Sequence, residues 1–129
     1  MKRATLLLTM TVVCLVLSTP ALAVGPDDGL YLITETNPAF APRLVYVSVH
    51  QNDNFLSNGF NILILNLNPS GTSWDYGLLR RTGNTVQGTL YGTNGQAYGS
   101  TSGTISDGTV NGQVIIRGVP FTLSGSRLF

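Results

Sequence analysis

The chain has 129 residues, of which 43% are hydrophobic and 10% are charged, and its formal net charge is +1. A charge so close to zero provides no long-range field for nucleic acid or for an anionic membrane surface, so neither is expected as a partner. The apolar content is too high, and the charge too low, for a disordered chain. The length corresponds to one domain.

The first 23 residues differ in composition from the rest. Lys2 and Arg3 precede an apolar run over Ala4–Leu17, and the small-residue pattern Ala21-Leu22-Ala23 follows. This order is typical of a secretory signal peptide, and the run is too short for a membrane-spanning helix. We expect cleavage after Ala23 and a single domain over residues 24–129, secreted or periplasmic. The only cysteine, Cys14, lies within this expected signal peptide and is removed with it. The exported domain is therefore expected to have no disulfide.

The remainder predicts an all-β fold. Short β-branched and aromatic runs alternate with Gly, Asn, Asp and Pro turns, and no stretch has a helical period. Short connections between neighbours favour antiparallel pairing, and Asp107-Gly108 is the strongest hairpin signal. We predict a small eight-stranded antiparallel up-and-down barrel, with a β-sandwich as the alternative. The expected strands are Leu30–Thr36, Leu44–Gln51, Phe60–Leu67, Ser73–Arg80, Thr85–Tyr91, Ala97–Ser106, Thr109–Arg117 and Val119–Leu128.

Glycines recur on the apolar face of the predicted strands. Alternation with period two places Val45, Val47 and Val49 on one inner face, and Val110, Val114 and Ile116 on another. The same alternation places four glycines on the inner face of their predicted strands, namely Gly88, Gly103, Gly112 and Gly125. Such glycines weaken a flat strand, and they are expected where a sheet bends sharply to close.

Two short sites resemble the calycins, the lipocalin-like group of small barrels. Asp28-Gly29-Leu30-Tyr31 opens the first predicted strand, and Arg127 lies on the inner phase of the last. These sites are similar to the Gly-x-Trp opening and the late arginine of calycins, with Tyr31 in the place of the tryptophan. The resemblance implies a barrel that holds a small apolar ligand, with the arginine packed over the aromatic ring at the closed end.

Four residues are candidates for ligand binding, namely Tyr31, Trp74, Tyr76 and Arg127. Trp74 and Tyr76 share one face of their predicted strand, either as core or as the lining of a pocket for an apolar or ring-shaped ligand. A buried Arg127 needs an ion-pair partner, an aromatic ring or a ligand, because an unsatisfied buried charge costs several kcal/mol. We expect it to stack on Tyr31 or Trp74, and recognition of an anion is the alternative.

The third predicted strand, Phe60–Leu67, is apolar on both faces. Its outward side therefore needs cover, either from the Asn52–Gly59 loop or from a second molecule. We favour self-association, which makes the chain a candidate homo-oligomer. The candidate interface residues are Leu44, Tyr46, Leu63, Leu65 and Leu67.

No catalytic or metal-binding set stands out. Ser48 and His50 lie two apart on one strand face, a spacing of about 7 Å that does not by itself make a dyad. Glu35 and Asp75 are the acids within predicted strands, and nothing in the sequence brings them together. Asn52-Asp53-Asn54 lacks the spacing of a calcium loop. We expect no metal, no cofactor and no enzymatic activity.

These observations favour an exported, non-enzymatic β-barrel binding module for a small apolar or amphipathic ligand or for a protein partner. A small outer-membrane barrel is one alternative, supported by the strand count and the C-terminal Phe129. Against it, most of the predicted strands are shorter than the 9–11 residues needed to span. The other alternative is an inhibitor of a secreted enzyme that inserts the residues 24–28 tail or the Asn37–Pro42 loop into a cleft.

Overall fold

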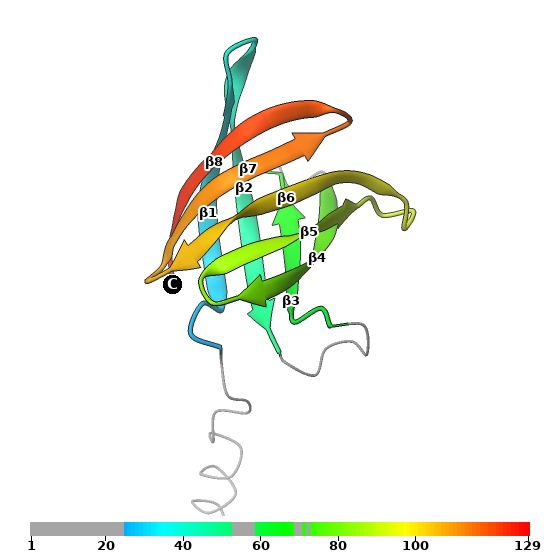
Figure 1. Ribbon diagram of the computed structural model, residues 1–129. Helices are drawn as coiled ribbons and strands as arrows, with labels where there is room; N and C mark the ends of the chain where they lie inside the picture. The colour runs from blue at the N-terminus through cyan, green and yellow to red at the C-terminus, as the bar shows by residue number, and fades with distance from the viewer. Residues whose placement is uncertain (1–24, 53–58, 69–70, 72) are drawn as a thin grey trace, which may run out of the picture.

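The computed structural model describes residues 25–52, 59–68, 71 and 73–129, so the expected signal peptide lies outside the described residues. The described chain forms a closed eight-stranded barrel (Figure 1). Within these ranges no helix is long and apolar enough to cross a membrane. The strands are β1 (Gly29–Asn37), β2 (Phe40–Gln51), β3 (Ile62–Leu67), β4 (Trp74–Thr82), β5 (Thr85–Tyr91), β6 (Ala97–Ser106), β7 (Thr109–Ile116) and β8 (Val119–Arg127).

Strand order equals chain order, as expected for an up-and-down barrel. Each strand pairs antiparallel with the next, and β1 closes the sheet on β8 from Tyr31↔Arg127 to Thr36↔Thr122. The β1–β2 hairpin extends beyond the neighbouring strands (Figure 1). The barrel prediction is therefore confirmed over the sandwich.

The start of β2 differs from the prediction more than any other strand boundary. We expected a loop over Asn37–Pro42, whereas β2 already begins at Phe40, which pairs with Asn37. The reason is a tight turn, in which the Asn37 side chain accepts a hydrogen bond from the Ala39 amide at 2.8 Å. No long loop remains there to enter a cleft.

Two hairpin turns have both central residues at positive φ. Asp107 and Gly108 have φ of 51° and 74°, which confirms the predicted turn. Arg117 and Gly118 form a second pair with φ of 49° and 83°. The sequence indicated only Gly118 as a turn residue, because arginine carries no preference for this conformation.

The barrel interior follows the predicted alternation. Val45, Val47 and Val49 of β2 face inward, as do Val110 and Val114 of β7. The buried apolar residues are Tyr31, Ile33, Val47, Val49, Ile62, Leu79, Leu90, Ile105, Val114 and Phe121.

The inward glycines allow adjacent strands to approach closely. A Cβ added to Gly88 would lie 2.1 Å from the Leu78 carbonyl oxygen. Gly103 and Gly112 face each other across β6 and β7, where a Cβ on either would lie within 2.8 Å of the other's Cα. No side chain fits at such distances, so glycine is required where the sheet bends to close.

The outside of the barrel is apolar on one side only. Outward positions of β5–β8 carry mainly hydroxyl and amide side chains, such as Gln87, Ser102, Asn111 and Thr122. The outward positions of β2–β4 form a continuous surface that we call the outer apolar face. It consists of Leu44, Tyr46, Leu63, Leu65, Leu67, Trp74, Tyr76 and Leu78.

Candidate functional site

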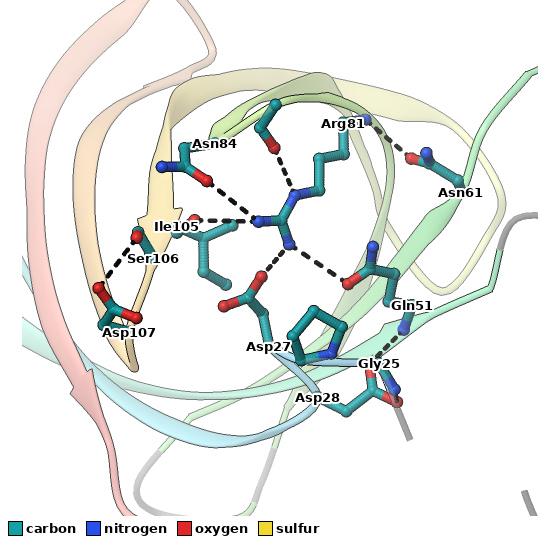
Figure 2. A network of polar contacts seen from close by, with 12 residues as sticks. Gly25, Asp27, Asp28, Gln51, Asn61, Arg81, Asn84, Ile105, Ser106 and Asp107 are labelled. Atoms are coloured by element: carbon teal, nitrogen blue, oxygen red, sulfur yellow. Dashed lines mark hydrogen bonds and ion pairs between the residues drawn. The ribbon is translucent and has the colours of Figure 1, made fainter. Parts of the chain in front are cut away.

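One end of the barrel is closed by the segment that precedes β1. Asp27 is only 3% exposed and forms an ion pair with Arg81, whose side chain enters the barrel from the end of β4. Figure 2 shows the Arg81 guanidinium in the middle of the barrel end, where it also donates to Gln51 Oε1 at 3.3 Å and to the Ile105 carbonyl at 3.4 Å. The charge is therefore paired and hydrogen bonded, which a buried ion pair requires.

Two of the four predicted ligand residues belong to this closed end. Tyr31 is fully buried, and its hydroxyl donates to the Asp27 carbonyl at 2.8 Å. Burial raises the pKa of Tyr31, although nearby Arg127 acts in the opposite direction. Arg127 donates to the carbonyls of Pro26 at 2.9 Å and Asp28 at 3.4 Å. Tyr31 and Arg127 thus hold residues 26–28, which precede β1, at the closed end of the barrel.

The environment of Arg127 differs from the prediction. We expected a guanidinium buried among apolar side chains, whereas Arg127 is exposed because β8 ends there. It lies beside Tyr31 at the closed end and is hydrogen bonded to the Pro26 and Asp28 carbonyls and to the Tyr31 side chain.

Trp74 and Tyr76 lie on the outside of the barrel, which corrects the expectation that they line a pocket with Tyr31 and Arg127. Trp74 is 53% exposed and pairs with outward Leu67. Tyr76 stacks on Tyr91 with ring centroids 5.3 Å apart. Both faces of β4 have apolar residues, and the structure places the Gly77 and Leu79 face inside. The four predicted residues therefore do not converge.

The opposite end of the barrel opens into a cavity of about 330 Å³ that we call the mouth pocket. Its walls come from β1–β7 and the β3–β4 connection and combine ionisable, amide and apolar side chains. The main lining residues are Glu35, Arg43, Asn66, Asp75, Leu90, Tyr98 and Ile116.

One wall of the mouth pocket is an ion pair between neighbouring strands. Glu35 of β1 lies opposite Arg43 of β2, and its carboxylate binds the Arg43 guanidinium. The Arg43 Cζ also lies 4.9 Å from the centroid of the Phe121 ring, within the range of a cation–π contact. Arg43 is thus held by two partners, and it neutralises Glu35.

The facing wall contains a second carboxylate with neutral partners. Asp75 of β4 accepts a hydrogen bond from Asn66 Nδ2 at 2.5 Å and interacts with the Tyr98 hydroxyl. Burial, the hydrogen bond with Asp75 and the nearby carboxylates raise the pKa of Tyr98 well above its ordinary value. Tyr98 therefore stays neutral, and its hydroxyl donates a hydrogen bond to the Asp75 carboxylate.

A β-bulge directs Tyr98 into the mouth pocket. Leu90 pairs with Gly99 and Tyr91 pairs with Ala97, so Tyr98 is the extra residue of β6. An extra residue changes the direction in which a side chain points, and bulges are common beside functional sites. Simple alternation would have placed Tyr98 outward with Ser100, which explains why the sequence did not indicate it.

A narrow apolar cavity of about 80 Å³ continues from the mouth pocket into the barrel. It shares Glu35, Asn66 and Leu90 with the mouth and is otherwise lined mainly by core side chains such as Val47 and Leu79. Its volume is about a quarter of that of the mouth pocket. The barrel is thus closed at one end and open at the other, where the polar mouth pocket leads into the narrow apolar cavity that forms its floor.

Glu35 and Asp75, which the sequence left as unconnected acids, both line the mouth pocket. Ser48 and His50 also differ from the prediction, since Ser48 Oγ lies 2.8 Å from His50 Nε2. Side chains that lean along the strand meet across a spacing that separates their backbones. The pair lies on the outer surface, and no carboxylate is hydrogen bonded to His50 within the described part of the chain.

No three His, Cys, Asp or Glu side chains of the described ranges are placed to hold a metal ion. Of the Asn52-Asp53-Asn54 sequence, the last two residues lie outside those ranges. Comparisons with models of protein families, with curated proteins and with solved structures find no match. The resemblance to calycins rests on residues 28–31 and Arg127 alone.

Proposed function

We propose that the protein is an exported, non-enzymatic binding module that takes a small amphipathic ligand in the mouth pocket. The observation that carries this proposal is the difference between the two barrel ends. The Asp27–Arg81 pair closes one end, whereas the other opens into about 330 Å³ with ionisable walls and an apolar floor. Small-molecule sites commonly combine apolar walls with a few polar groups that orient the ligand.

Two features of the chain support the exported and soluble part of the proposal. The leader pattern over residues 1–23 is typical of secretion. The outward faces of β5–β8 carry mainly hydroxyl and amide side chains, with Ile115 as an exposed apolar exception, whereas an outer-membrane barrel requires an apolar belt around its whole circumference. This one-sided exterior weighs against the membrane alternative.

A fragment screen by amide NMR tests the proposal. We expect binding fragments to shift the amides of Leu90, Tyr98 and Ile116, which surround the mouth pocket. Ser73→Trp adds a large side chain at the rim of that pocket, so it should weaken binding at least about tenfold. Ser124→Trp, on the outward face of β8, is the matched control and should leave binding unchanged. Fragments that shift only the closed end or the exterior would contradict the proposal.

We propose as a second function that two copies associate through the outer apolar face. Leu44, Leu65, Leu67 and Trp74 are 39% to 53% exposed and present on the order of 400 Å² of apolar surface. This is about half of what each partner of a standard interface buries, before the partly exposed neighbours are added. His50 and Arg80 are the ionisable groups that border the face among the described residues, so two copies meet with little charge repulsion.

Leu65→Asp should convert dimers to monomers, because it places a carboxylate in the middle of the outer apolar face. We expect the dimer dissociation constant to rise at least about tenfold in sedimentation velocity. Thr122→Asp, on the polar side of the barrel, should have no such effect. A wild-type protein that sediments as a monomer at high concentration would remove this second function.

A further inference from the structure

The mouth pocket has an uneven distribution of charge. Glu35 is neutralised by Arg43, which the Phe121 ring also holds. Neither ion pair of the described residues involves Asp75, whose hydrogen-bond partners are neutral. The other nearby cation, Arg117, lines a separate depression beyond Tyr98. Among the described residues, the Asp75 carboxylate therefore has no cation paired with it.

The Asp75 carboxylate also keeps capacity for a further hydrogen bond. A carboxylate has about four lone-pair positions, and Asn66 and Tyr98 each use one. Asp75 lines the pocket together with apolar Leu90 and Ile116. A donor placed in the pocket thus has a charged acceptor on one side and apolar walls on the other.

We propose that the mouth pocket selects a compact ligand with a protonated amine, bound by the Asp75 carboxylate, and an apolar body that rests on Leu90 and Ile116; this inference rests on the binding function proposed above. An anionic head group would face Asp75 and Glu35, while Arg43, the one cation among the described lining residues, is already bound to Glu35. A long acyl chain exceeds the cavity of about 80 Å³ below the mouth. A compact cation therefore fits both the charge and the volume.

Three probes with one carbon skeleton test the ligand class, namely 3-phenylpropylamine, 3-phenylpropan-1-ol and 3-phenylpropionate. Calorimetric titration of the purified protein should give an amine affinity about tenfold above that of the alcohol, because a hydrogen bond between two charged groups is stronger than one with a neutral donor. The carboxylate should bind weakest. Added salt should weaken the amine and leave the alcohol unchanged.

Asp75→Asn should remove the advantage of the amine over the alcohol, because it removes the charge of the acceptor while keeping its shape. Asp107→Asn is the matched control, because Asp107 lies in the turn at the other end of the barrel and asparagine tolerates its positive φ. It should leave all three affinities unchanged. The comparison of probes on the wild-type protein stands without any variant.

Two results would overturn the inference, and they differ from each other. If the alcohol or the carboxylate binds as tightly as the amine and shifts the Leu90 and Tyr98 amides, the pocket binds ligands but the charge selection is wrong. If none of the three shifts those amides at millimolar concentration, the proposed binding function fails as well.

Discussion

Replacing Arg81 with methionine is expected to lower the free energy of unfolding by about 3–5 kcal/mol, the range for removal of one partner from a buried ion pair. The Arg81 side chain is 13% exposed and that of Asp27 is 4% exposed. Without the guanidinium, the Asp27 carboxylate remains buried with no opposite charge, and Gln51 and the Ile105 carbonyl lose a donor. Urea unfolding followed by far-ultraviolet circular dichroism measures the change.

The neighbouring arginine provides the control. Arg80 lies one residue earlier on β4 and is exposed, so Arg80→Met should change the free energy of unfolding by less than about 1 kcal/mol. Adding Asp27→Leu to Arg81→Met removes the unpaired carboxylate and should recover most of the loss. Equal losses from Arg80→Met and Arg81→Met would mean that the ion pair does not hold the closed end.

Gly88→Ala is expected to lower the free energy of unfolding by about 3 kcal/mol, at the upper end of the usual range for overpacking. The added Cβ would lie 2.1 Å from the Leu78 carbonyl oxygen and 2.7 Å from the Leu79 Cα. Both atoms belong to the backbone of β4, so no side-chain rotation relieves the contact. Urea unfolding measures the loss, and exchange of the β4–β5 amides with deuterium shows whether the two strands separate.

Gly92→Ala is the matched control for this prediction. Its new Cβ would meet only the exposed Asn94 side chain, with the nearest atom, Oδ1, at 3.1 Å. A small shift of that side chain relieves the contact and affects at most one exposed hydrogen bond, which Oδ1 accepts from the Gln96 amide. We expect a change of less than about 1 kcal/mol. If both variants lose the same stability, the close approach of β4 and β5 at Gly88 is not what requires glycine there.

The sequence was less informative about the candidate site than about the fold. It indicated Glu35 and Asp75 as the acids within strands, but their meeting in the mouth pocket depends on closure of the barrel, which brings β1 and β4 to a common rim. It did not indicate Tyr98, because the bulge in β6 reverses the alternation at that residue. It also drew attention to Arg127, while the guanidinium inside the barrel end belongs to Arg81.

Sequence patterns predicted the eight strands, their antiparallel order and most of the inner wall, because alternation, turn chemistry and inward glycines act between residues close in the chain. Which face of β4 lies inside depended instead on the tertiary structure. Both faces are partly apolar, so the choice depends on the volume that Ile64 and Leu90 leave beside Gly77. The tertiary structure also set which end of the barrel is closed, because Asp27 and Arg81 are far apart in the chain and meet only when the barrel forms.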